Sequence, residues 1–397
     1  MDTYQSAAEL VRTFPVEKPV LGLRPHAAMR AARWFLNHFP GKILYAVKAN
    51  NAPALIAALH AAGIRHFDVA SKPEIRQIAG LKGATAHIMH PVKSRRLIAE
   101  AYHDFGVRTF ALDTEAELEK ILAETGHAKD LTLLVRMSCP SNFSEIPLEG
   151  KFGISWHKAP DLLRKTRLVA DCFGLTFHVG SQAMSPAAYG NALRAVSQHI
   201  VQAGVVTDVI DVGGGFPACY PGLVPPPLSA YMAEIGEAFD RVMVGYSCEL
   251  WCEPGRALVA EAESVIVKVE ARKGDTLYVN DGAFGTLFDA AHAKFVFPAT
   301  AISKAGEPFT AVPLAQFDLY GPTCDSFDHM PGPFLLPQTI GEGDFIEIGN
   351  IGAYGRAIAG HFNGFGVYDE VLLTDEPMLT MYGEDAPAMD EAVRASF

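Results

Sequence analysis

The chain has 397 residues, of which 49% are hydrophobic and 20% are charged, and its formal net charge is −12. Such a composition is typical of a globular protein with a large core, and the acidic balance argues against a nucleic acid partner, which requires a basic face. No apolar run approaches the roughly 20 residues of a membrane span. Six scattered cysteines predict no disulfide framework and no metal site. The N-terminal stretch lacks the pattern of a secretory signal, so we expect a cytoplasmic protein without a membrane partner.

Short apolar runs alternate with segments of helical spacing between residues 40 and 256. The runs are KILYAVK, HFDVAS, AHIMHPV, RTFALD, LTLLVRM, LTFHVGS, DVIDVGGG and ELWCEPGR. Good helix formers fill the intervals, as in APALIAALHAAG and TEAELEKILAETG. This alternation predicts parallel strands joined by helices, and eight repeats are the number found in a (β/α)8 barrel. An open doubly wound sheet would alternate in the same way, so the barrel prediction depends on the count of eight.

The pattern changes after Arg256. Segments such as ESVIVKVEARKGDTLYVND and GEGDFIEIGNIGAYG alternate polar and apolar residues and are rich in β-branched side chains, with turn residues between them. We therefore expect two domains in an α/β protein. Residues 25–260 form the barrel, and residues 1–24 together with 261–397 form a mainly β domain.

The first and last runs end in side chains of opposite charge, Lys48 and Glu253. Closure of a barrel makes its first and last strands neighbours, and functional residues of barrels lie at the carboxyl ends of the strands. One interpretation is a plain ion pair. A more specific one is pyridoxal 5′-phosphate (PLP), which requires a lysine for covalent attachment and an acid beside its pyridine nitrogen.

A phosphate group on such a cofactor requires a binding site for an anion. Residues 213–215 are a glycine triplet after the seventh run, where the backbone can approach an anion closely, and Arg256 adds a forked cation. Glycines also serve tight turns, and His178 in FHVGSQ is open to interpretation as an ordinary core histidine. At the mouth of a barrel, His178 would instead stack on the cofactor ring and Ser181 would reach the phosphate.

Six motifs in order resemble one family. YAVKAN, FHVGSQ, DVGGGFP, EPGR, GPTCDSFD and GAYG look like the fold-type III PLP-dependent decarboxylases of basic amino acids, nearest to the ornithine decarboxylases. The resemblance extends from about residue 25 to residue 370. It implies an alanine racemase-like fold, in which a (β/α)8 barrel is followed by a mainly β domain, with PLP as cofactor and no metal.

The resemblance also assigns roles to single residues. Lys48 matches the lysine that binds PLP, Glu253 the acid at the pyridine nitrogen and His178 the ring-stacking histidine. The further cofactor-binding or supporting positions that it implies are Asp68, Glu74, Arg136, Ser181, Gly213, Gly214, Gly215, Gly255, Arg256 and Tyr354.

A homodimer with shared active sites is implied by the same resemblance. Cys324 and Asp325 match a pair that reaches into the active site of the other subunit, while Lys151 and Asp328 match an ion pair across the interface. Cys324 is then the candidate acid that protonates the α-carbon of the substrate. A lone cysteine is otherwise most often a small buried hydrophobe.

The distal ammonium group of a basic amino acid requires carboxylates. The resemblance implies Asp325 and Asp289 for this purpose. Phe288 stands where eukaryotic members of the family usually have tyrosine, so one hydrogen bond near the substrate end is missing here. In a protein without this resemblance, lone aspartates in such loops would be interpreted as solvated turn residues.

The resemblance implies decarboxylation of L-ornithine to putrescine, a step of polyamine biosynthesis. Ornithine and lysine differ by one methylene, worth only about 1–3 kcal/mol in a pocket, so a lysine or dual lysine/ornithine decarboxylase that produces cadaverine is the main alternative. Diaminopimelate decarboxylase and arginine decarboxylase resemble the chain less. Alanine racemase places an arginine where this chain has Glu253. A non-catalytic regulatory homologue is the alternative outside the enzymes, although Lys48, Glu253, Arg256 and Cys324 are all present.

Overall fold

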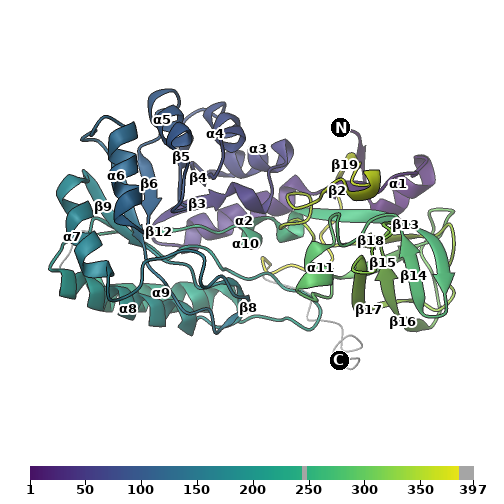
Figure 1. Cartoon of the computed structure of the whole chain (residues 1–397). Helices are drawn as coiled ribbons and strands as arrows, with labels where there is room; N and C mark the ends of the chain where they lie inside the picture. Colours follow the sequence, from purple (N-terminus) through teal and green to yellow (C-terminus); the bar gives the residue numbers. More distant parts are fainter. Residues whose placement is uncertain (244–247, 384–397) are drawn as a thin grey trace.

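The computed structural model describes residues 1–243 and 248–383. They form an α/β barrel beside a second lobe made mostly of β-strands (Figure 1). The predicted fold class, a (β/α)8 barrel followed by a mainly β domain, is thereby confirmed. Among the described residues, none of the helices combines the length and the apolar character that crossing a membrane requires.

Eight parallel strands form the barrel wall. They are β3 (Lys42–Ala46), β4 (His66–Asp68), β5 (Thr85–His87), β6 (Thr109–Leu112), β7 (Thr132–Arg136), β9 (Cys172–Thr176), β11 (Val209–Asp211) and β12 (Glu249–Cys252). Their order around the wall is β5-β4-β3-β12-β11-β9-β7-β6. A parallel bridge between Ile88 and Phe110 joins the two ends of this series. Since β3 pairs with β12, the first and last strands are neighbours, as barrel closure predicts.

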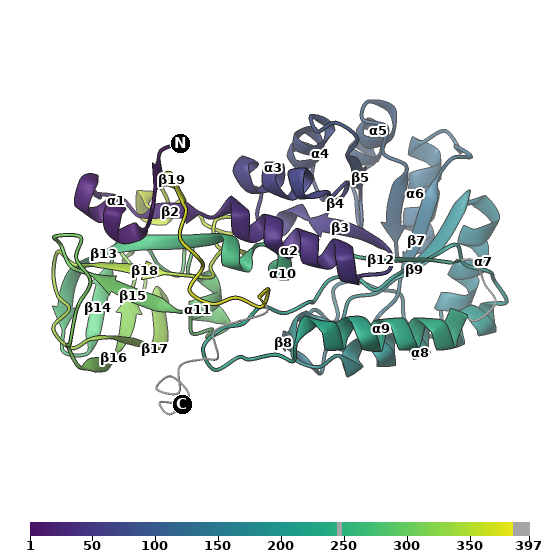
Figure 2. The same ribbon diagram turned by 180° about the vertical axis from the view of Figure 1, so that it is seen from behind.

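A helix follows each barrel strand, and most of these helices cover the outer face of the wall (Figure 2). These helices are α3 (Pro53–Ala62), α4 (Lys72–Ala79), α5 (Arg95–His103), α6 (Glu115–Glu124), α7 (Ala159–Val169), α8 (Ala187–Ala203), α9 (Leu228–Met243) and α10 (Arg256–Val259). Side-chain oxygens of Ser71, Ser94 and Thr114 cap α4, α5 and α6 at their N-termini. Helix α8 ends at Gly204 in the left-handed conformation. A further helix, α2 (Pro25–His38), precedes β3 and packs against α3 and α10.

The sixth barrel strand is shifted relative to the run LTFHVGS. Strand β9 ends at Thr176, so His178 and Ser181 lie beyond it. Gly180 and Gln182 have positive φ angles of 97° and 57°, which turn the chain away from the wall. The chain then forms β10 (Ser181–Ala183), which pairs antiparallel with β8 (Ser144–Ile146) above the barrel wall. The bend brings His178 and Ser181 to the mouth of the barrel, meaning the carboxyl ends of its strands.

The second lobe is a nine-stranded sheet. Its strands are β1 (Thr3–Tyr4), β2 (Val20–Leu23), β13 (Glu263–Lys273), β14 (Thr276–Val279), β15 (Ala299–Ile302), β16 (Leu314–Tyr320), β17 (His329–Pro337), β18 (Phe345–Ile348) and β19 (Asp369–Leu373), with α1 (Ala7–Thr13) and α11 (Phe288–His292) beside them. Strand β2 lies between β13 and β19. Two N-terminal strands thus belong to this sheet. The domain boundaries at residues 24/25 and 260/261 stay a prediction, and residues 384–397 lie outside the described residues.

Contacts between the two lobes carry residues of the second lobe to the barrel mouth. One continuous apolar core includes side chains from both lobes. The buried Asn50 side chain, just after β3, donates to Glu263 Oε2 (2.5 Å) and to the Gly352 carbonyl (2.8 Å). The Tyr354 N–H donates to the Ala49 carbonyl at 2.8 Å. These bonds place Tyr354 beside the segment that carries Lys48.

Candidate active site

A cavity of about 470 Å³ lies at the mouth of the barrel. Residues at or just after the ends of most barrel strands line it, as the location of chemistry in such barrels predicts. The predicted site residues among them are Lys48, Asp68, Arg136, Lys151, His178, Ser181, Gly214, Gly215, Glu253, Gly255, Arg256 and Tyr354. The volume is in the range of small-molecule sites.

Lys48 reaches the cavity because the chain leaves the sheet one residue before it. Strand β3 ends at Ala46, and the 3₁₀ turn Val47–Ala49 follows. The Lys48 ammonium lies 3.0 Å from Oδ2 of Asp68, at the end of the neighbouring strand β4. The Asp68 carboxylate raises the pKa of Lys48 above its ordinary value. Glu74 stands behind this pair and accepts a hydrogen bond from the Ala70 N–H at 2.6 Å, so it supports the loop after β4.

Glu253 follows β12 and is buried on the side of the barrel that faces β9. Its Oε1 lies 3.5 Å from Oγ1 of Thr176, and its N–H donates to the Gly213 carbonyl at 2.8 Å. Burial, together with the nearby Asp211 carboxylate, raises the pKa of Glu253 well above its ordinary value. Sequence analysis missed Asp211, although it lies in DVIDVGGG. Two adjacent buried carboxyl groups favour retention of a proton.

The glycine triplet after β11 serves two purposes. Gly213 has a φ of 69°, and a Cβ there would lie 2.0 Å from the Phe177 carbonyl oxygen. Its N–H donates to Asp211 Oδ1 at 2.8 Å, so Gly213 forms the turn and its N–H has a partner. Gly214 and Gly215 line the cavity. A Cβ at Gly214 would lie 2.7 Å from the Glu253 carbonyl oxygen and 3.1 Å from His178 Nε2. The absence of side chains leaves room for an anion at this wall.

Arg256 is buried beside the glycine wall. Its guanidinium donates to Tyr220 Oη (3.0 Å), Asp289 Oδ2 (2.8 Å) and Ser181 Oγ (3.5 Å). Nε of Arg256 is buried and has no hydrogen-bond partner among the described residues. The guanidinium also lies 5.1 Å from the centre of the Tyr354 ring. Sequence analysis missed Tyr220, because a tyrosine in a proline-rich loop gives no pattern that separates it from a core residue.

Two histidines line the cavity, and they differ in the hydrogen bonding of their Nδ1 atoms. His178 Nδ1 accepts a hydrogen bond from the Gly180 N–H at 3.1 Å. Burial and the positive charges of Arg136 and Lys48 lower the pKa of His178 well below its ordinary value, so its flat ring is neutral. His90, at the end of the third run, also lines the cavity, and its buried Nδ1 has no partner among the described residues. Sequence analysis did not name His90 as a site residue.

Four predicted substrate or catalytic residues lie outside the cavity wall of this chain. Cys324 is exposed, and its N–H donates to Asn363 Oδ1 at 3.1 Å. Oδ1 of Asp325 accepts from the N–H two residues further on. Phe288 stacks on His292 with ring centroids 4.1 Å apart. Asp289 is bound to Arg256 in a buried ion pair.

Lys151 and Asp328 have different surroundings. Lys151 lines the cavity. Asp328 is 1% exposed, and its Oδ2 accepts hydrogen bonds from the N–H (3.0 Å) and the hydroxyl (2.7 Å) of Thr323. Its Oδ1 accepts from the Ala283 N–H at 2.7 Å. In the single chain both carboxylate oxygens of Asp328 therefore already accept hydrogen bonds. An ion pair with Lys151 of a second subunit would be an additional interaction of this buried carboxylate.

The residues present fit PLP. An amine follows β3 and a buried acid follows the neighbouring strand β12, and a flat neutral imidazole reaches the same cavity from the segment after β9. Near Arg256, the glycine wall, a serine hydroxyl and an unpartnered guanidinium N–H form a site for a phosphate group. Lys48 would hold the cofactor, Glu253 would face its ring nitrogen, and Arg256 would bind its phosphate.

The fold and this site define a barrel enzyme that binds PLP, and the family comparison agrees. Residues 26–260 match the model of the pyridoxal-dependent decarboxylase pyridoxal binding domain, and residues 206–352 match the model of the pyridoxal-dependent decarboxylase C-terminal sheet domain. The chain belongs to the family of fold-type III pyridoxal-dependent decarboxylases of basic amino acids, close to the ornithine decarboxylases. It is a PLP-dependent carboxy-lyase.

Similar sequences are named after more than one substrate. A lysine/ornithine decarboxylase of Selenomonas ruminantium is 30% identical over 352 residues, which cover 86% of each chain. An ornithine decarboxylase of Panagrellus redivivus is 33% identical and covers 84% of this chain and 80% of the relative. An antizyme inhibitor 2 of Xenopus laevis is 30% identical and covers 83% and 75% of the two chains.

Solved structures are similar over nearly the full length. The crystal structure of lysine/ornithine decarboxylase from Vibrio vulnificus, complexed with cadaverine, has a TM-score of 0.78 and 29% identity, and covers 94% of this chain and all of the other. The relatives together support decarboxylation of a basic amino acid.

Proposed function

We propose that this enzyme decarboxylates L-ornithine to putrescine and CO2, a step of polyamine biosynthesis, in the cytoplasm. The observation that carries the choice of ornithine is the similarity to ornithine decarboxylases at up to 33% identity, together with the segment GPTCDSFD. All six cysteines are free thiols, which suits a reducing compartment.

We assign Lys48 to the covalent attachment of PLP. When bound, PLP supplies an attachment point for the substrate amine and accepts the electrons of the bond that breaks at the α-carbon. The 3.0 Å contact with Asp68 fixes Nζ of Lys48 at the cavity wall. The side chain of Lys48 is 48% exposed to the cavity, so Nζ is accessible to the cofactor and to a substrate amine.

Glu253 is proposed to keep the cofactor's ring nitrogen protonated. Burial and the nearby Asp211 carboxylate raise the pKa of Glu253, which favours a protonated carboxyl at this position. The Glu253 carboxyl would face the ring nitrogen of bound PLP and would keep a proton at that position, because opposite charges interact strongly in a buried place. Neutral His178 can lie against the ring without adding a competing charge.

Phosphate binding is assigned to the wall around Arg256. Ser181, Gly214, Gly215, Gly255 and Tyr354 line the same part of the cavity. The Asp289 carboxylate and the Tyr220 hydroxyl hold the guanidinium in one orientation, at 2.8 and 3.0 Å. In this arrangement Asp289 positions Arg256. A second proposed role of Asp289 is to contact the distal ammonium group of the substrate.

The active enzyme is proposed to be a homodimer with shared sites. Cys324 and Asp325 are needed near the substrate, yet both lie outside the cavity wall of their own chain. A neighbouring subunit that inserted them into the cavity would place a thiol near the α-carbon and a carboxylate near the distal ammonium. Lys151 at the cavity rim and Asp328 four residues after Cys324 are the proposed contacts of the same interface.

Sharing of sites predicts that two inactive variants restore each other. Lys48→Ala and Cys324→Ala each inactivate both sites of their own dimer. After subunit exchange in an equal mixture, half of the dimers are mixed, and each mixed dimer has one intact site, so activity returns to about a quarter of the wild-type value. The specific activity of the mixture after reassociation measures this. A mixture as inactive as its components would contradict the shared site.

Substrate choice is tested by comparing kcat/KM for L-ornithine, L-lysine, L-arginine and meso-diaminopimelate. We expect ornithine to exceed lysine by about 10- to 200-fold, the discrimination that one methylene allows. Arginine and diaminopimelate should be slower still. Equal values for ornithine and lysine would favour a dual enzyme, which the Selenomonas relative makes the second candidate. A preference for lysine, arginine or diaminopimelate would contradict the proposal.

A further inference from the structure

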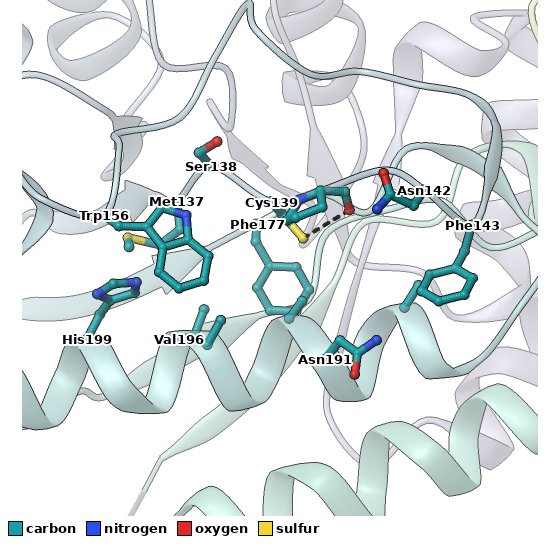
Figure 3. Close-up of a pocket in the computed structure, with 14 residues that line it drawn as sticks. Met137, Ser138, Cys139, Asn142, Phe143, Trp156, Phe177, Asn191, Val196 and His199 are labelled. Carbon is teal, nitrogen blue, oxygen red and sulfur yellow. Dashed lines mark hydrogen bonds between the residues drawn. The ribbon is translucent and has the colours of Figure 1, made fainter.

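A second cavity, of about 240 Å³, lies outside the barrel wall, between the ends of β7 and β9 and helix α8 (Figure 3). Ala188, Ala192, Ala195 and Val196 of α8 line it, at spacings of one, three and four residues that place them on one face of the helix. Such small side chains leave space that leucine or phenylalanine would fill. The sequence of α8 thus creates the cavity.

The walls of this cavity are mostly apolar, and the polar residues among them, Ser138, Asn142, Asn191 and His199, are not acids, lysines or arginines. Phe143 and Trp156 stand at its rim and are 42% and 44% exposed, and the Cys139 thiol lies between them (Figure 3). Burial raises the pKa of Cys139 to about 11, so the thiol stays protonated and behaves as an apolar group. The described residues that line the cavity include no aspartate, glutamate, lysine or arginine. A zwitterionic amino acid or a diamine product would therefore lose hydration here without gaining an ion pair.

One buried polar atom of a residue that lines the cavity lacks a partner among the described residues. The ring of Trp156 packs edge-on against His199, with centroids 5.0 Å apart and an angle of 83°. His199 is 4% exposed, and its Nδ1 has no hydrogen-bond partner among the described residues. Buried polar atoms normally have a partner, so this nitrogen is a binding position for a hydrogen-bonding group of a ligand.

The two cavities share a wall of backbone. Arg136 lines the active-site cavity, and the next residue, Met137, lines the second cavity. In the same way His178 lines the first and Phe177 the second. Neighbouring side chains of an extended chain point to opposite sides, which explains the arrangement. A molecule in the second cavity would contact the backbone that positions two proposed cofactor residues.

We propose that the second cavity binds a small, uncharged aromatic molecule of one or two fused rings with one hydroxyl or N–H group, which pairs with Nδ1 of His199, and that this molecule modulates the neighbouring active site. The size fits, because a cavity of about 150 Å³ already holds benzene. The proposed binding of the aromatic molecule depends only on the second cavity. The proposed modulation depends in addition on the proposed decarboxylase activity.

Indole is a suitable probe, and its binding to the PLP-loaded enzyme is measured by calorimetry and saturation-transfer NMR. Ala195→Phe places a ring in the cavity and should weaken binding by at least about tenfold. Val201→Phe adds the same ring on the exposed face of α8, where Val201 is 76% exposed, and should bind indole like the wild type. Absence of saturable binding, or equal binding by both variants, would overturn the proposal.

A second variant tests the polar contact without filling the cavity. His199→Leu removes Nδ1 and keeps a side chain of similar size, so it should weaken indole binding by about three- to tenfold, the value of one hydrogen bond. Binding of naphthalene, which has no N–H group, should not weaken. Equal loss for both probes would contradict the role of Nδ1.

The proposed modulation of the active site is tested separately, by enzyme kinetics. Saturating indole should change kcat/KM for the preferred basic amino acid in the wild type and in Val201→Phe, and leave Ala195→Phe unchanged. Unaltered turnover in the wild type with indole bound would overturn the modulation. If no basic amino acid were decarboxylated, the proposed function would fail while the binding result stood.

Discussion

Lys48→Ala should reduce decarboxylation by on the order of 10³ or more, because the variant loses the amine that holds PLP and positions it for the substrate. The visible absorbance band of bound PLP should disappear with the activity. The fold should persist, since the Lys48 side chain is half exposed and water entering the cavity replaces the ammonium beside Asp68. Turnover at several substrate concentrations, the absorbance spectrum and the melting temperature measure these three effects.

A second lysine on the same strand provides a matched control. Lys42 lies at the opposite end of β3 and pairs with Glu249 of β12 at 2.5 Å, with side chains 38% and 56% exposed. Exposed pairs of this kind contribute less than about 1 kcal/mol. Lys42→Ala should therefore keep both the PLP band and the activity. Near-normal activity of Lys48→Ala, or equal losses in both variants, would contradict the assignment of Lys48.

Glu253→Gln should lower kcat by about 10²- to 10³-fold while PLP remains bound through Lys48, because the electrostatic stabilisation of charge in a buried site is lost. Glutamine has nearly the same shape, but it cannot pass a proton to the ring nitrogen or become an anion beside it. Since Glu253 is buried with a raised pKa, the neutral amide should be tolerated by the fold. Steady-state kinetics and the PLP absorbance band separate the loss of rate from a loss of cofactor.

Glu249→Gln is the control for this variant. Glu249 is the first residue of β12, the strand that Glu253 follows, and lies four residues earlier at the exposed end. Its conversion to glutamine should leave kcat unchanged. An active Glu253→Gln enzyme would show that no anion is needed at the ring nitrogen, and loss of PLP from this variant would show that Glu253 instead holds the cofactor in place.

Much of the fold and of the cavity could be predicted from the sequence. The alternation of apolar runs with helical segments predicts the barrel, because the barrel strands are mostly buried and most of the helices that follow them bury one face. Barrel closure then made Lys48 and Glu253 neighbours across residues far apart in the chain, and β3 does pair with β12. Arg136, His178 and Ser181 reach the same cavity for the same reason.

Other features depend on three-dimensional contacts that leave no periodic signal. Asp211 lies in a strand and has no pattern that marks it as a site residue, yet burial raises its pKa, and its carboxylate adds to the effect of burial on the pKa of Glu253. The ion pair between Arg256 and Asp289 joins two lobes and has no mark in the sequence. The unpartnered nitrogen of His199 becomes visible only when α8 packs against Trp156.

One measurement bears most directly on the central claim, that an amine from the first barrel strand and an acid from the last enclose one vitamin B6 ring. Borohydride reduction of the PLP-loaded enzyme fixes the cofactor to its lysine, and peptide mass spectrometry then locates the modified residue. We expect a pyridoxyl group on Lys48. A pyridoxyl group on Lys93, Lys151 or another lysine, with Lys48 unmodified, would contradict it.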